Sequence, residues 1–351
     1  MKLSAYAASY LIIYMGQRGV VLGFSGGIDS CASARWLTER GYRVVALTID
    51  TMHDANLMRN AELKAKELGI EWMSIDATEL FRREIVDYFT SSYRQGLTPA
   101  PCTRCNPMIK WRTLLSVADN LGIDHIATGH YFNIEQHNGH YYVAKGIDPA
   151  KDQSYYLWGL DDCILSRAIT PMGNAIKSEI KANVANKSES MGICFLCGKH
   201  YTEFLQDEGI ELTAGDILDQ QGIVVGQHNG IARYTIGQKR GQGIPEGMRI
   251  IDIRSDDNSL IVGPNENLYK TKLYIKECNI VDREELLSST DITIKIRGIG
   301  RNPERPVKVS EWEDGFIVEC DDAAWAPAKG QPLVMYRGNL VIGGGIVVGF
   351  N

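Results

Sequence analysis

The chain has 351 residues, of which 44% are hydrophobic, and a formal net charge of −6. This length leaves room for two or three domains, and no apolar run approaches the roughly 20 residues that a membrane-spanning helix needs. The acidic balance argues mildly against a nucleic acid partner, although a local basic face would be compatible with one. Eight cysteines in a chain of this length fit a cytoplasmic enzyme with reactive or metal-binding thiols better than a disulfide scaffold. Residues 2–14 are apolar but lead directly into a predicted strand, so we expect no secretory signal.

A glycine-rich turn joins the first predicted strand to the first predicted helix. Residues 19–30, GVVLGFSGGIDS, form an apolar run that ends in two glycines, an aspartate and a serine. Gly26 and Gly27 permit backbone angles and close approaches that a side chain would block, and the amides at a helix N-terminus bind anions. A Walker loop would contain a lysine here. None follows, so we expect the hydroxyls of Ser25 and Ser30 to take its place. The pattern favours the pyrophosphate of ATP, and the alternative is a purely structural turn.

Strands and helices alternate over the following hundred residues. We predict helices at 31–40, 56–68 (ending at Gly69), 78–93 and 106–121, and strands at 42–50, 71–76 and 124–128. This alternation predicts a doubly wound parallel sheet of α/β type, with ligands bound beyond the carboxyl ends of the strands. Gly129, which follows the strand at 124–128, would border the same crevice.

The second half of the chain has a different pattern. Residues 132–143 alternate around Asn138 and Gly139 and predict a hairpin. From Gly215 onwards, short alternating strands with glycine and asparagine turns are typical of small β domains, the last of them barrel-like. We therefore predict three domains, at 1–199, 200–266 and 267–351.

Two C-x-x-C segments carry the candidate sulfur chemistry, TPAPCTRCN at 98–106 and GICFLC at 192–197. Asn106 and Pro107 predict an N-cap and a first helical position, which would place the Cys105 thiol just off a helix N-terminus. The helix dipole there favours a thiolate, and Arg104 adds positive charge nearby. We expect a reactive thiol at Cys105, the alternative being an inert loop cysteine. The remaining isolated cysteines are interpreted as packing residues: Cys31, Cys163, Cys278 and Cys320.

The sequence resembles a known enzyme family. SGGIDS resembles the loop of the PP-loop ATP pyrophosphatases, which cleave ATP between the α and β phosphates. TPAPCTRCNPMIKW, IATGHY, AKDQSYYL, SESMGICF, YTIGQKRGQGI and KGQPLVMYRGNLVIGGGI then occur in the order found in the tRNA-specific 2-thiouridylases. This resemblance implies an ATP-dependent transfer of persulfide sulfur to C2 of the wobble uridine, position 34, in the anticodon loop of tRNAs of the Lys, Glu and Gln type.

The resemblance also implies roles for individual residues. Cys105 would be the catalytic nucleophile and Cys194 the persulfide carrier, and the two would form a transient disulfide. The ATP-binding positions would be Gly23, Phe24, Ser25, Gly26, Gly27, Ile28, Asp29, Ser30, Ile49 and Gly129. Ala100, Pro101 and Cys102 would border the target base. The tRNA-binding positions would be His130, Lys151, Asp152, Gln153, Arg297, Gly298 and Gln331. For most of these tRNA positions, solvated charge, a turn or a structural histidine is the open alternative.

The chain departs from the family pattern in several places. Ala100 and Cys102 stand where asparagine and, in many members, aspartate are expected, and Gly298 replaces an expected aromatic residue. The segment 172–190 is shorter than usual. Cys102 raises an alternative to metal-free persulfide chemistry, because Cys102, Cys105 and Cys194 could hold a four-iron four-sulfur cluster or, with Cys197, zinc.

The expected cofactors are ATP and Mg²⁺, and the expected partners are tRNA and a cysteine desulfurase or sulfur-carrier protein. We expect a local basic face that includes Arg233, Lys239, Arg240 and Arg297 to bind the tRNA. Two other function classes stay open. One is a different adenylating PP-loop ligase or amidotransferase, which would not need paired cysteines, and the other is a zinc-containing RNA-binding protein.

Overall fold

The computed structural model describes residues 18–182, 192–296 and 302–351. The chain forms two compact units, each assembled from separate stretches of sequence. Unit 1 comprises Met1–Leu80, Asn106–Ser154 and Leu160–Glu189, and unit 2 comprises Phe81–Cys105, Tyr155–Gly159 and Ser190–Asn351.

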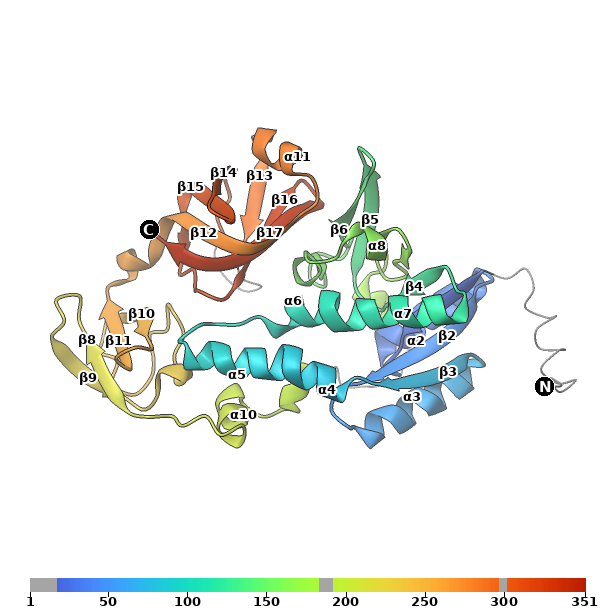
Figure 1. The fold of residues 1–351 in the computed structure, drawn as a ribbon, viewed down its shortest axis with the longest axis horizontal. Coiled ribbons are helices and arrows are strands. Elements are labelled where there is room, and N and C mark those ends of the chain that lie inside the picture. The colour runs from blue at the N-terminus through green and yellow to red at the C-terminus, as the bar shows by residue number, and fades with distance from the viewer. Residues whose placement is uncertain (1–17, 183–191, 297–301) are drawn as a thin grey trace, which may run out of the picture. The chain divides into compact units, whose positions relative to one another are not determined.

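Unit 1 is built on a parallel sheet. Its elements, of which α4 and η3 end in unit 2, are β1 (Gly19–Gly23), α2 (Ile28–Glu39), β2 (Arg43–Asp50), α3 (Ala55–Leu68), β3 (Glu71–Asp76), α4 (Thr78–Phe81), η2 (Asn106–Trp111), α7 (Arg112–Leu121), β4 (His125–Ala127), β5 (Phe132–His137), β6 (His140–Lys145), η3 (Ser154–Tyr156), α8 (Asp162–Leu165), β7 (Ala168–Ile169) and α9 (Lys177–Ala182). The strand order β3-β2-β1-β4-β7 is parallel throughout. Helix α3 lies on one side of the sheet and α7 on the other (Figure 1). The predicted doubly wound sheet is confirmed.

Local chemistry explains why these elements begin and end where they do. Asp54 caps α3 by accepting hydrogen bonds from the amides of Asn56 and Leu57, and Gly69 ends the helix with a φ of 66°, a conformation that glycine adopts without strain. The predicted hairpin is also present, because Asn138 and Gly139, with φ angles of 50° and 84°, turn β5 into β6. Both signals could be read directly from the sequence.

The helix predicted to begin at Asn106 begins earlier. Helix α6 (Pro101–Cys105) is followed without a break by η2, a π-helical segment, and then by α7. Pro101 takes the first helical position, where its missing N–H costs nothing. Pro107 lies inside the run, and the wider π turn accommodates a residue that cannot donate to the carbonyl four positions back. The prediction of an N-cap at Asn106 is therefore wrong.

Unit 2 combines helices with two β-sheets, a smaller mixed sheet in which β8 and β11 pair in parallel and a larger sheet whose unit 2 strands pair antiparallel. Its elements are η1 (Arg82–Val86), α5 (Asp87–Arg94), α6, η4 (Cys194–Leu196), α10 (Tyr201–Asp207), β8 (Gly215–Leu218), β9 (Val224–His228), η5 (Ile231–Arg233), β10 (Arg249–Arg254), β11 (Ser259–Gly263), η6 (Asn265–Leu268), β12 (Tyr269–Ile280), α11 (Arg283–Ser288), β13 (Ile292–Lys295), β14 (Val307–Trp312), β15 (Gly315–Trp325), β16 (Pro332–Arg337) and β17 (Leu340–Phe350). The smaller sheet has the order β10-β11-β8-β9, and the larger contains the path β13-β16-β17-β12-β15-β14. The predicted β domains are thus present.

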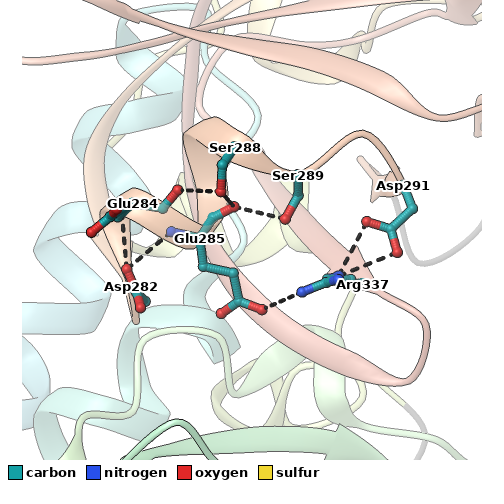
Figure 2. Close-up of polar contacts among 7 residues, drawn as sticks. All are labelled: Asp282, Glu284, Glu285, Ser288, Ser289, Asp291 and Arg337. Carbon is teal, nitrogen blue, oxygen red and sulfur yellow. Dashed lines mark hydrogen bonds and ion pairs between the residues drawn. The ribbon is translucent and has the colours of Figure 1, made fainter.

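A polar network fixes α11 on the larger sheet (Figure 2). Asp282 caps the helix by accepting from the amides of Glu284 and Glu285. Arg337, at the end of β16, donates to the buried carboxylate of Glu285 at 3.0 Å and to that of Asp291 at 3.1 Å. The hydrogen bond to Glu285, followed by that to Asp291, raises the pKa of Arg337. The network secures the start of β13, which leads to the predicted tRNA-binding residue Arg297.

Candidate functional site

The glycine-rich loop of unit 1 lies between β1 and α2. Strand β1 ends at Gly23, and α2 begins at Ile28 with Gly27 as its N-cap. Phe24 is 3% exposed, and its amide donates to the carbonyl of Leu47 at 2.8 Å. Within the described residues no side chain caps α2, so the amides of its first turn are left to an anion or to water.

Two glycines are required for this loop to pack. Gly26 has a φ of +71°, and a Cβ there would lie 3.0 Å from the Cα of Ala61 on α3. Gly129 follows β4 and crosses the first turn of α2, where a Cβ would lie 3.1 Å from both the carbonyl carbon of Asp29 and the amide of Ser30. Because these neighbours are backbone atoms, a side chain at either glycine would displace the loop.

A lysine reaches the loop from a distant part of the chain. The Nζ of Lys177, the first residue of α9, lies 2.6 Å from Oδ1 and 2.7 Å from Oδ2 of Asp29. The two serines expected to replace a lysine are engaged locally. Ser30 is 6% exposed and donates from Oγ to the carbonyl of Gly27 at 3.0 Å. The exposed Ser25 accepts from the amide of Gly27 at 3.3 Å.

The Asp29 carboxylate is also held by an aromatic residue. The hydroxyl of Tyr131 donates to Oδ1 of Asp29 at 2.7 Å, and the Lys177 ammonium lies 5.7 Å from the centre of the Tyr131 ring. The backbone amide of Lys177 donates to Oδ2 of Asp148 at 2.9 Å. The lysine is thus fixed at both its backbone and its ammonium.

The remaining predicted residues of unit 1 lie at strand ends and in the following loops. Ile49 lies near the end of β2 and is partly buried. His130 shares a hydrogen bond of 2.8 Å between its Nδ1 and Oγ1 of Thr128, and its ring stacks on that of Trp111 at a centroid distance of 6.4 Å. Burial, followed by the charge of Lys110, lowers the pKa of His130 to about 3. The imidazole is therefore neutral at physiological pH and can take part in hydrogen bonds or stacking.

The segment 151–153 (KDQ) is held in unit 1 by hydrogen bonds of its own side chains. Asp152 accepts hydrogen bonds from the amides of Gly146 and Ser154 at 3.1 and 3.2 Å. Gln153 accepts from the amide of Tyr131 at 2.9 Å. These contacts favour the turn role for Asp152, which the sequence left as an alternative. Lys151 is partly exposed.

In unit 2, both cysteines of the segment 98–106, Cys102 and Cys105, lie within helix α6. Cys105 is its last residue and is 5% exposed, whereas Cys102 is partly exposed near the helix N-terminus. The predicted effect of the helix dipole therefore acts more directly on Cys102 than on Cys105. Burial and then the nearby Cys102 raise the pKa of Tyr156. Ala100 is partly exposed and Pro101 is buried.

Arg104 points to a carboxylate. Its Nε donates to the carbonyl of Glu84 at 3.0 Å, and its terminal nitrogen donates to Oε2 of Glu84 at 3.2 Å. The guanidinium also lies 5.0 Å from the centre of the Tyr88 ring. The hydrogen bonds from Arg83 and then Arg104 lower the pKa of Glu84. Arg104 thus joins α6 to η1, and its charge is balanced by Glu84.

The second cysteine segment is anchored by the residue after Cys194. Phe195 is 2% exposed, and its ring centre lies 5.8 Å from that of Phe81, 5.1 Å from that of Phe89 and 5.1 Å from that of Phe204. Cys194 itself is exposed. Since Arg104 and Phe195 both pack on the helical run formed by η1 and α5, this run carries both cysteine segments.

The cysteines form no metal cluster or disulfide in the described parts of the chain. None of the eight is in a disulfide, and no group of three or more histidine, cysteine, aspartate or glutamate side chains there is placed to hold a metal ion. The cluster considered for Cys102, Cys105 and Cys194 therefore has no preformed set of ligands.

The other predicted tRNA contacts of unit 2 are scattered. Gln331 is partly buried just before β16, and its carbonyl accepts from the amide of Val347 at 2.8 Å. Lys239 and Arg240 are exposed, while the Nε of Arg233 donates to the carbonyl of Asn229 at 3.2 Å. Arg297 and Gly298 lie outside the described residues. No helix in the described ranges has the length and apolarity needed to cross a membrane.

Sequence reasoning missed two residues of the loop site, Lys177 and Tyr131. Tyr131 belongs to the IATGHY motif and could have been suspected from its position after Gly129. Lys177 is separated from Asp29 by 148 positions, and no local spacing pointed to it.

Comparisons with known proteins cover the chain in three parts. The family model described as the tRNA methyl transferase HUP domain matches residues 18–198, that of the tRNA methyl transferase PRC-barrel domain matches 202–264, and that of the aminomethyltransferase beta-barrel domain matches 270–347. A solved structure described as a predicted subunit of tRNA methyltransferase from Methanocaldococcus jannaschii is 18% identical, covers 55% of this chain and 88% of its own, and has a TM-score of 0.35. That likeness is too low to bear on fold or function.

Curated relatives match over most of their length. A tRNA-specific 2-thiouridylase, MnmA 2, of Phocaeicola vulgatus is 36% identical over 94% of this chain and 97% of its own. MnmA 3 of Bacteroides fragilis, of the same description, is 38% identical over 94% of each chain. MnmA 1 of Clostridium botulinum is 34% identical over 94% of this chain and 99% of its own.

Proposed function

Because this chain belongs to the family of tRNA-specific 2-thiouridylases, we propose that it is a tRNA-uridine 2-sulfurtransferase. It would replace O2 of the wobble uridine with sulfur at the expense of ATP. The observation that carries the proposal is the match along nearly the whole chain, which includes both C-x-x-C segments. We propose the division 1–199, 200–266 and 267–351 for its domains, and the cytoplasm, where tRNA and sulfur carriers meet, for its location.

The first step would activate the uracil. O2 attacks the α-phosphorus of ATP, and pyrophosphate leaves, so that C2 then carries AMP as a leaving group. The loop Gly23–Ser30 would hold the phosphates through the first-turn amides of α2, with Ile49 and Gly129 completing the ATP site. The wobble base would have to leave the anticodon stack, which costs least in a single-stranded loop.

The second step would transfer sulfur. A persulfide on Cys194 attacks C2 with its terminal sulfur, and AMP leaves with the bonding electrons. The Cys105 thiolate then attacks the Cys194 sulfur, which releases thiouracil and forms a Cys105–Cys194 disulfide. Alternatively, Cys105 attacks the persulfide first, and the hydrosulfide set free attacks C2. A thiol reductant reopens the disulfide, and a cysteine desulfurase or sulfur carrier renews the persulfide.

Mg²⁺ is expected to accompany the ATP phosphates and to reduce their charge. The loop does not fit a separate divalent site, because its one carboxylate, Asp29, already accepts from Lys177 and Tyr131. We therefore assign no step to the metal.

The proposal is tested by two measurements. Nucleoside analysis of tRNA from cells that lack the protein should show loss of 2-thiouridine, and the purified protein with ATP and a persulfide donor should restore it. The nucleotide products should be AMP and pyrophosphate. ADP as the main product, or an unchanged nucleoside profile, would contradict the proposal.

Cysteine variants supply the matched controls. Cys105→Ser and Cys194→Ser should each abolish thiolation, and only Cys194→Ser should also prevent persulfide loading by the donor. Cys163 lies outside both motifs and is exposed, so the packing role expected for it from the sequence is wrong. Cys163→Ser should therefore leave thiolation intact.

A further inference from the structure

The Lys177 side chain is 6% exposed. Burying an ammonium is strongly unfavourable unless opposite charge and hydrogen bonds compensate for it. Here both carboxylate oxygens of Asp29 lie at hydrogen-bond distance, at 2.6 and 2.7 Å. The charge of Lys177 is therefore kept inside unit 1, directly against the first turn of α2.

The position of this ammonium is set by several independent contacts. Asp148, which is 9% exposed, accepts from the Lys177 amide and so fixes the start of α9. Tyr131 donates to Asp29 and holds the carboxylate from the other side. A charge fixed in this way needs little reorganisation when an anion arrives.

The loop itself has an electrostatic difficulty. Its first-turn amides attract an anion, but Asp29, in the same turn, carries a negative charge that repels phosphate. Residues 19–30 contain no lysine or arginine to offset that charge. Lys177 is the cation that the fold brings to Asp29.

We propose that Lys177 is the phosphate-binding cation of this loop, and that Asp29 and Tyr131 are positioning residues that hold it. Its ammonium contacts the β and γ phosphates of ATP and, after cleavage, the pyrophosphate product. This inference rests on the proposed ATP-dependent function. The competing explanation is that Lys177 only neutralises Asp29 and stabilises the loop, without touching a ligand.

Binding measurements on the full chain separate the two explanations. Calorimetric titration would use ATP, AMP and inorganic pyrophosphate with wild type, Lys177→Met and Lys177→Arg. Hydrogen bonds to charged groups contribute about 1.5–3 kcal/mol, so Lys177→Met should weaken ATP and pyrophosphate binding roughly 10- to 150-fold. AMP affinity should change less than about twofold, because AMP lacks the contacted phosphates. Lys177→Arg should retain most of the ATP affinity, and Lys181→Met, an exposed lysine on the same helix, should retain all of it.

A double variant guards against a trivial loss of folding. Lys177→Met leaves Asp29 without this partner, and the loop can lose order for that reason alone. Asp29→Asn combined with Lys177→Met removes both charges at nearly constant shape, so its melting temperature should approach that of wild type. If its ATP affinity stays low while AMP affinity is normal, the lysine contacts phosphate. If its ATP affinity recovers together with stability, the lysine served only to neutralise Asp29, and the inference is overturned.

The outcomes also separate this inference from the proposed function. Equal loss of ATP and AMP affinity in Lys177→Met, or no loss of either, would refute the role of the lysine even if wild type thiolates tRNA. A lysine-dependent preference for ATP over AMP in a protein that never thiolates tRNA would refute only the proposed function. Wild type that binds neither ATP nor pyrophosphate would refute both.

Discussion

Replacement of Phe195 by alanine should detach the Cys194 segment from unit 2. Phe195 is 2% exposed and packs against three other phenylalanine rings at centroid distances of 5.1 to 5.8 Å. Loss of a buried phenyl ring costs about 3–5 kcal/mol in a well-packed core. The residues beside it form only a short 3₁₀ turn, η4, which supplies little structure of its own.

The cost should therefore appear as local opening. A loss of about 3 kcal/mol corresponds to a more than 100-fold rise in the population of the detached segment. The free energy of global unfolding should fall by less than the full cost, since the segment can leave before the rest of the unit unfolds. Sulfur transfer should slow, because Cys194 would spend less time in its native place.

Hydrogen exchange measures this opening directly. The amides of Leu196 and Cys197 donate to the carbonyls of Ile193 and Cys194 at 3.2 and 3.3 Å, so their exchange reports on the turn. Phe195→Ala should accelerate their exchange strongly, and Phe195→Leu, which keeps most of the apolar volume, should do so far less. Unchanged exchange in Phe195→Ala would refute the reasoning, whatever happens to activity.

Three further predictions follow from charged and titratable groups. The pKa of His130 is lowered to about 3 from an ordinary 6.5, so as the pH drops the unfolded state binds the proton first, and the free energy of unfolding should fall below about pH 6.5. Between pH 7 and 5 this linkage predicts a loss of roughly 2 kcal/mol at most. In His130→Asn, the free energy of unfolding measured with urea should depend less on pH over that range. If the exposed Lys239 contacts a tRNA phosphate, Lys239→Ala should reduce the slope of log affinity against log salt by about one, and an unchanged slope would remove it from the interface. Arg337→Met should lower the melting temperature more than Asp291→Asn, since Arg337 also forms an ion pair with Glu285, whose side chain is 7% exposed. Equal effects on the melting temperature would contradict this ranking.

Much of unit 1 could be predicted because its signals are local. The strand at Glu71–Asp76 and the helix ended by Gly69 follow from apolar runs and one glycine. The helix start at Pro101 was missed because Asn106 and Pro107 imitate a cap, while a π-helical segment lets the helix run through the proline. Local propensity gives no indication of a π turn.

The candidate site was only partly predictable for a related reason. Sequence motifs identify Gly26, Asp29 and the cysteines of the two C-x-x-C segments, because the residues within each motif lie close together in the sequence. The partners of these residues come from elsewhere: Lys177 meets Asp29, and Glu84 meets Arg104. Such contacts depend on tertiary packing. The sequence therefore placed the charge of Arg104 near the Cys105 thiol but could not show that Arg104 forms an ion pair with Glu84.

The aromatic cluster around Phe195 also bears on biosynthesis. Phe81 and Phe89 emerge from the ribosome well before Phe195 and Phe204, with which they pack. With roughly 100 intervening residues and translation at about 5–20 residues per second, these rings would wait on the order of ten seconds for their partners. The helical run that carries Cys105 therefore cannot complete its packing co-translationally until the chain beyond residue 200 has been made. Nascent chains stalled before that point would display an apolar surface suited to a chaperone.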